Sequence, residues 1–65
     1  MELKIWKERI KRNVTLRDLS ERTGISRAAL NNYENGIRSP TIEQLEMIAK
    51  ALDCRISDLF ESDFK

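Results

Sequence analysis

Residues 15–36 read TLRDLSERTGISRAALNNYENG, and the residues that begin and end helices in this stretch decide the fold. Thr15 and Asp18 make a T-x-x-D capping box, in which the hydroxyl accepts a free backbone N–H and the carboxylate faces the positive end of the helix. Gly24 predicts where this helix ends, because glycine readily adopts the left-handed backbone of a helix C-terminus. We therefore expect a short helix over residues 16–23.

A second short helix is predicted after a tight turn. Ser26 is its expected N-cap, and Asn35-Gly36 ends it, because the glycine is free to take a positive φ. The helical spacing of Leu30 and Tyr33 turns one face of the segment 26–34 toward a core. Two short helices that meet at a glycine turn form a helix-turn-helix arrangement.

The opposite face of the segment 26–34 carries short polar, methyl and cationic side chains. These are Arg27, Ala28, Asn31 and Asn32. The major groove of DNA admits one α-helix, where arginine can bridge O6 and N7 of guanine and asparagine can bridge N6 and N7 of adenine. An ordinary solvated helix face has the same composition. From the residues alone, a DNA-reading face and a solvated face both stay open.

The rest of the chain predicts one all-α domain, a compact five-helix bundle over residues 1–65. Asn13 ends the first helix, Thr41 with Gln44 caps the fourth, and Ser57 caps a short last one. The five predicted helices cover about residues 2–12, 16–23, 26–34, 41–52 and 57–61.

The apolar residues recur at helical spacing, and together they predict a single core. The expected members are Ile5, Trp6, Leu16, Leu19, Ile25, Leu30, Tyr33, Ile42, Leu45, Ile48, Leu52, Ile56, Leu59 and Phe60. Phe64 has two interpretations: its ring folds back onto the domain, or it sits at a dimer interface. Cys54 is expected to be a small, part-buried apolar residue rather than a redox group.

The composition excludes several kinds of stabilisation and chemistry. A chain of 65 residues with one cysteine and no histidine predicts no disulfide, no metal site and no cofactor. No group of residues suits catalysis or a small-molecule pocket, so we expect no enzyme. Without an apolar run long enough for a bilayer or a signal peptide, the chain is expected to be a cytoplasmic protein with no membrane partner.

The charges are divided along the chain. Residues 1–40 hold nine Lys/Arg and five Asp/Glu, a net charge of +4, whereas residues 41–65 hold three Lys/Arg and six Asp/Glu, a net charge of −3. A basic front and an acidic back suit one face on phosphate and the other away from it. Ordinary solvated charge explains the same division equally well.

The stretch Thr15–Gly36 resembles the helix-turn-helix of the phage repressor and Cro class, also called the xenobiotic-response-element family. The residues that match are Thr15, Leu19, Ser20, Gly24, Ile25, Ser26, Leu30, Tyr33, Glu34, Asn35 and Gly36, followed by Arg38, Ser39, Pro40, Thr41, Leu45, Ile48, Ala49, Lys50, Ala51, Leu52, Ser57, Leu59 and Phe60. The resemblance covers about residues 3–61. It implies a lambda-repressor-like fold and favours DNA binding over a solvated face.

The resemblance also implies site residues. Base edges would be read by Arg27, Ala28, Asn31 and Asn32. Phosphates would be held by Thr15, Leu16, Arg17, Ser26, Asn35, Arg38 and Ser39. The chain departs from the family at Leu16, where a phosphate-binding glutamine is frequent, at Glu8, where the family is usually apolar and Trp6 is expected to compensate, and at Asn13 and Asp53, where glycine is frequent.

In similar proteins, residues at the positions of Arg9 and Glu34 form an ion pair beneath the surface. Arg9 lies on the expected inward face of the first helix, and Glu34 ends the segment 26–34. We expect a structural salt bridge between them; two separate surface charges are the alternative.

The leading hypothesis is a sequence-specific regulator of transcription that binds double-stranded DNA. Its recognition helix, Ser26–Tyr33, would lie in the major groove, and the protein would act as a homodimeric repressor on a two-fold operator. The alternative is a protein-interaction or antitoxin-type module with the same fold, which would dock a partner through its acidic C-terminal half and Phe64.

Overall fold

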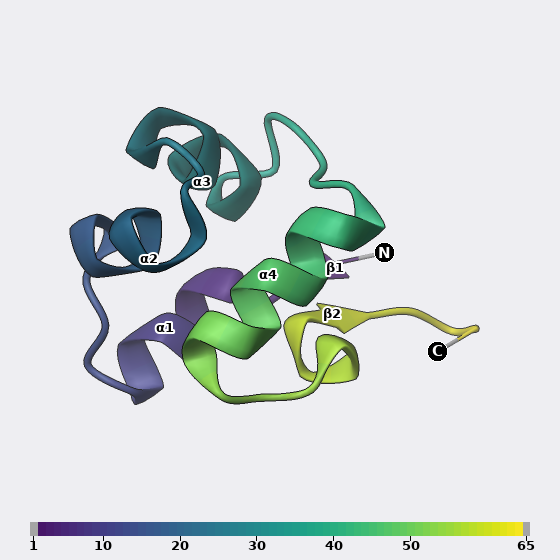
Figure 1. Cartoon of the computed structure of the whole chain (residues 1–65). Helices are drawn as coiled ribbons and strands as arrows, with labels where there is room; N and C mark the ends of the chain where they lie inside the picture. The colour runs from purple at the N-terminus through teal and green to yellow at the C-terminus, as the bar shows by residue number, and fades with distance from the viewer. Residues whose placement is uncertain (1, 65) are drawn as a thin grey trace.

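The computed structural model describes residues 2–64, so Met1 and Lys65, the two ends of the predicted domain, lie outside the described residues. Within this range the chain forms four α-helices, one turn of 3-10 helix and a two-stranded sheet (Figure 1). In chain order these are β1 (Glu2–Leu3), α1 (Ile5–Lys11), α2 (Leu16–Thr23), α3 (Arg27–Glu34), α4 (Ile42–Leu52), η1 (Ile56–Leu59) and β2 (Phe60–Glu61).

The predicted capping boxes begin two of the helices. At the start of α2, the Asp18 amide donates to the Thr15 hydroxyl over 3.0 Å, and the Thr15 amide donates to the Asp18 carboxylate over 3.3 Å. At the start of α4, Thr41 and Gln44 exchange the same two bonds, each 3.0 Å long. Gly24 ends α2 with a φ of 77°, as predicted. Local capping chemistry therefore determines where these helices begin and end.

The fifth predicted helix is wrong. Residues 56–59 form a single 3-10 turn, and Ser57 is not its cap. The Arg55 amide donates to the Asp58 carboxylate over 3.0 Å, and the N-cap position is Arg55, two residues before the predicted cap. It ends because Phe60 is extended, with φ −150° and ψ 158°, and enters β2. The family resemblance correctly predicted the helical core, but the bundle has four α-helices among the described residues instead of five.

The sequence analysis also missed the sheet. The first helix was predicted from residue 2, but β1 occupies its first two positions and pairs with β2 in antiparallel register, Leu3 opposite Phe60. The Lys4 amide continues this pairing by donating to the Leu59 carbonyl over 2.7 Å. The two ends of the domain therefore lie together, on the side of the molecule away from α2 (Figure 1).

The core lies between the helices and contains most of the residues predicted for it. Its buried apolar members are Ile5, Val14, Leu19, Ile25, Leu30, Tyr33, Leu45, Ile48, Ala49, Leu52 and Leu59. Leu16 and Ile56 are half-buried and pack against it, and Phe60 is half-buried.

Two of the predicted core residues are wrong. Trp6 is 56% exposed and Ile42 is 72% exposed. Ile42 is the first residue of α4 and precedes that helix's first buried position, Leu45. Helix α1 turns Ile5 and Glu8 inward, and this places Trp6 on the outer face. Trp6 therefore does not replace the apolar residue missing at position 8, and the Glu8 carboxylate itself is buried.

Candidate nucleic-acid interface

The predicted base-reading face lies on the outside of α3. Arg27, Ala28 and Asn31 are exposed, and Asn32 is half-buried. On the opposite side of the helix, Leu30 and Tyr33 are buried in the core. Burial of one face and exposure of the other is the arrangement that a helix needs in order to present side chains to a groove while the rest of the domain holds it.

The turn between α2 and α3 is held by two hydroxyl groups whose roles sequence reasoning missed. The Ser20 hydroxyl donates to the Ile25 carbonyl over 2.6 Å. The Thr23 hydroxyl donates to the Leu19 carbonyl over 2.8 Å and accepts the Ile25 amide over 3.1 Å. The signal available in the sequence was a serine and a threonine within four residues of the turn glycine. These bonds fix the direction in which α3 leaves the turn.

The two ends of α3 are also held. At its start, the Ser26 hydroxyl accepts the Ala29 amide over 3.1 Å, and the hydroxyl proton stays available to an outside acceptor. At its end, the Asn32 carbonyl accepts the amides of Ile37 and Arg38 over 2.9 and 3.3 Å, which folds the following loop back against the helix.

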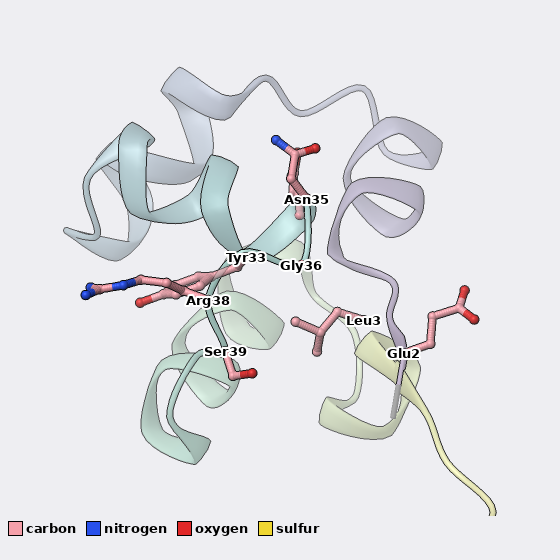
Figure 2. A pocket seen from close by; sticks show the side chains of 8 residues that line it. Glu2, Leu3, Tyr33, Asn35, Gly36, Arg38 and Ser39 are labelled. Carbon is pink, nitrogen blue, oxygen red and sulfur yellow. The ribbon is translucent and has the colours of Figure 1, made fainter.

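Three predicted phosphate contacts follow one another along this loop. Asn35, Arg38 and Ser39 all line a surface hollow of about 460 Å³ between the loop and β1. Figure 2 shows the side chains of Asn35 and Arg38 pointing in different directions, so the loop spreads its polar groups instead of focusing them on one point. Among the described residues, Arg38 is exposed and forms no ion pair.

The start of α2 offers fewer free groups than the loop. The capping box occupies the Thr15 hydroxyl, the Thr15 amide and the Asp18 amide. The amides of Leu16 and Arg17 carry no such bond, and a helix N-terminus with free N–H groups suits an anion. The Arg17 side chain, 76% exposed, already forms an ion pair of 3.4 Å with Glu21. Arg17 is therefore a less available cation than Arg38.

The expected partners Arg9 and Glu34 form a bidentate ion pair. Arg9 Nε donates to Glu34 Oε2 over 2.8 Å, and Arg9 Nη2 donates to Glu34 Oε1 over 3.1 Å. Arg9 Nη1 also donates to the Val14 carbonyl over 3.0 Å. The side chains are only 9% and 5% exposed, so this pair ties α1 to the end of α3 from inside the fold.

Burial raises the pKa of the Cys54 thiol above its ordinary value, which keeps it protonated; the residue is half-buried, as predicted. No cluster of three or more histidine, cysteine or acidic residues within 2–64 has the arrangement of a metal site. None of the helices in this range is sufficiently long and apolar to cross a membrane.

Comparisons with known proteins agree with this geometry. A family model described as helix-turn-helix matches residues 7–59. YopS, a transcriptional regulator of the helix-turn-helix type derived from the SPbeta prophage of Bacillus subtilis, is 38% identical over 52 residues, which cover 78% of this chain and 70% of YopS. The chain spans between 29% and 70% of the length of the curated relatives that it matches.

Two solved structures share the fold. The clp gene regulator ClgR from C. glutamicum is 30% identical, with a TM-score of 0.79 over 83% of this chain and 70% of the other. The N-terminal DNA-binding domain of SinR from Bacillus subtilis has a TM-score of 0.81 over 95% of this chain and 91% of the other, at 24% identity. The likeness to SinR supports the fold alone.

Proposed function

We propose a specific mode of action for this chain, which belongs to the helix-turn-helix family of DNA-binding transcriptional regulators: α3 reads the major groove of an operator. Arg27, Ala28, Asn31 and Asn32 would contact base edges. Thr15, Leu16, Arg17, Ser26, Asn35, Arg38 and Ser39 would contact phosphates and set the orientation of the domain.

One observation carries this proposal: α3 is held rigidly at both ends while an unpaired cation stands on its outer face. Arg27 is exposed and, within residues 2–64, forms neither an ion pair nor a side-chain hydrogen bond. Because Arg27 has no partner in the free protein, no ion pair has to be broken before it binds guanine. A helix fixed by the Ser20 and Thr23 hydroxyls loses little conformational entropy on binding.

The rest of the mode of action follows from the geometry of such sites. We infer that this domain acts as a homodimer, whose recognition helices enter successive major grooves about 34 Å apart on a two-fold operator. Repression is the simplest outcome, since a protein that occupies an operator can block polymerase. The proposed protein binds DNA and catalyses no reaction, and it acts in the cytoplasm, where its DNA target lies.

The test is selection of duplexes from a randomised pool, followed by titration of the selected duplex against salt. We expect a two-fold motif. Arg27→Ala should cost about 1–3 kcal/mol of binding free energy and relax the preference at one position, because a base contact is lost. Arg38→Ala should weaken all sequences alike and reduce the salt slope by about one, because a phosphate contact is lost.

Lys50→Ala is the matched control, since it removes an exposed cation from α4, far along the chain from every expected contact. It should leave both the motif and the salt slope unchanged. If no motif emerges and all three variants bind like the wild type, the groove-reading face is wrong and the antitoxin-type alternative gains ground.

A further inference from the structure

The C-terminal tail carries an aromatic ring that the domain does not cover. Phe64 is 97% exposed, and the tail runs away from the helices after β2 (Figure 1). Its amide donates to the Ser62 hydroxyl over 3.2 Å, a local bond that contributes no contact with the core. The expectation that this ring folds back onto the domain is therefore wrong. A phenylalanine ring that is 97% exposed is available to a second surface, and burying its apolar area there would be favourable.

A hollow of about 560 Å³ on the same domain offers apolar side chains to such a ring. It lies between β1, the start of α1 and the end of α3. Leu3 and the half-exposed Trp6 supply its apolar side chains, and Asn35 closes it on the side of α3. An indole beside an aliphatic side chain is a surface on which a second aromatic ring packs well.

One cation at the hollow is available to the acidic tail. Lys7 lines the hollow, is exposed and forms no ion pair among the described residues. Asp63, next to Phe64, is likewise exposed and unpaired within this range. Lys4 already forms an ion pair of 3.3 Å with Glu61 of its own chain. Lys7 is therefore the cation that can pair with a carboxylate from outside. Of the two carboxylates in the lining, Glu34 is neutralised by Arg9, and Glu2 is exposed at the β1 side.

We propose that the hollow receives Phe64 from a second copy of this chain, so that two copies exchange their tails across a two-fold axis. Because β1 pairs with β2, the hollow and the root of the tail lie at the same end of the domain. One two-fold axis at that end therefore satisfies both contacts at once, which an isologous dimer requires. This inference rests on the proposed function, because it names the surface through which the proposed homodimer forms.

The contact is small, and that has a consequence for assembly. One ring and one ion pair from each copy bury less surface than a standard stable interface, so the free dimer should be weak. Two DNA half-sites hold two domains at high effective concentration, and the tails should then add cooperativity to operator binding. The hollow touches the end of α3 through Glu34 and Asn35, so the dimer contact would lie beside the recognition helix.

Trp6 is the only tryptophan in the chain and reports on the hollow directly. We expect its emission to shift to the blue as the wild-type concentration rises, in parallel with the dimer fraction from sedimentation equilibrium. Phe64→Ser should abolish the shift and weaken dimerisation by about tenfold or more, both free and on a duplex with two half-sites. Ile42→Ser is the control, since it removes another exposed apolar residue, 72% exposed, outside the hollow and outside the proposed DNA contacts. It should change neither measurement.

A charge exchange tests the ion pair. Lys7→Glu alone should weaken the dimer, and the double variant with Asp63→Lys should restore it. Because Phe64, Lys7 and Asp63 are all exposed, the variants should keep the helical circular dichroism of the wild type.

Each outcome decides a different point. A blue shift that does not depend on concentration means that the tail occupies its own hollow, and it overturns the exchange. A wild-type dimer that Phe64→Ser leaves unchanged overturns this interface and leaves the proposed homodimer standing. A chain that stays monomeric on a duplex with two half-sites overturns the homodimer itself, and the tail exchange with it; loss of base reading by Arg27 is a separate failure, measured on a single half-site.

Discussion

Two neighbouring charges of α1 lie inside the fold, and each is paired in a different way. Arg9 reaches across to Glu34 at the end of α3, whereas Glu8 is paired within its own helix by Arg12 at 2.7 Å and Lys11 at 3.4 Å. The cross-helix pair connects the interior of the domain to the recognition helix. A buried charge without its partner lowers the free energy of unfolding. The contribution of this pair to stability is therefore seen when one member is removed.

At the residue scale, Glu34→Gln should destabilise the domain by about 3–5 kcal/mol, because the Arg9 guanidinium stays buried without a counter-charge. Urea denaturation followed by circular dichroism measures the loss. Glu21→Gln is the matched control: Glu21 also forms an ion pair with an arginine, but its side chain is 67% exposed. That change should shift the unfolding free energy by less than about 1 kcal/mol. Equal, small effects from both variants would remove the structural role assigned to the pair.

At the element scale, helix ends depend on the backbone conformation of single residues. Gly24 ends α2 and Asp53 ends α4, and both have positive φ, 77° and 55°. Glycine adopts this conformation without strain, whereas a side chain costs roughly 1–2 kcal/mol there. Asp53, where the family resemblance implies glycine, therefore holds this backbone at a cost.

We expect substitutions at these two positions to change the unfolding free energy in opposite directions. Asp53→Gly should raise the unfolding free energy by about 0.5 kcal/mol, because relief of strain exceeds the extra entropy of glycine in the unfolded chain. Gly24→Ala should lower it by about 1–2 kcal/mol through strain alone, since no atom lies within 4 Å of the added Cβ. Thermal unfolding of the two variants measures both signs. A rise for Gly24→Ala would contradict the explanation.

At the scale of the whole molecule, the helices share one core and should unfold together, so a single buried carboxylate affects the stability of the entire domain. The hydrogen bond from Arg12, helped by Lys11, lowers the pKa of the Glu8 carboxyl below its ordinary value of 4.5. In the unfolded chain this carboxyl binds its proton at higher pH than in the folded one. The paired Glu8 therefore stabilises the domain above pH 4.5, and that stabilisation is lost as pH falls through the lowered pKa.

We expect the unfolding free energy of the wild type to fall as the pH drops below about 4.5, with part of the slope coming from Glu8. Glu8→Gln should be less stable at neutral pH and should have a flatter slope, so that the two proteins converge in acid. Urea denaturation between pH 3 and pH 7, roughly the range in which carboxyl groups titrate, measures this. Glu46→Gln, at an exposed position of α4, should run parallel to the wild type.

Much of the helix-turn-helix was predictable because its determinants are local. The hydrogen bonds between Thr15 and Asp18 join residues only three positions apart. The positive φ of Gly24 depends on that residue's own lack of a side chain. The inward face of α3 follows from the 3.6-residue period alone. Val14, which the core prediction missed, also had a local signal: it precedes the Thr15 cap and joins Leu19 in the core, the pattern of a hydrophobic staple.

The sequence by itself thus determined the starts of α2, α3 and α4, the turn and the side of α3 that faces outward, because each depends on residues a few positions apart. Only the tertiary structure decided the features that depend on distant partners. Residues 2–3 become a strand because residues 60–61 lie beside them, and the same pairing reduces the last helix to one 3-10 turn. Trp6 is exposed and Glu8 buried because the rotation of α1 depends on packing against α3, α4 and η1, and a short amphipathic pattern leaves that rotation undetermined.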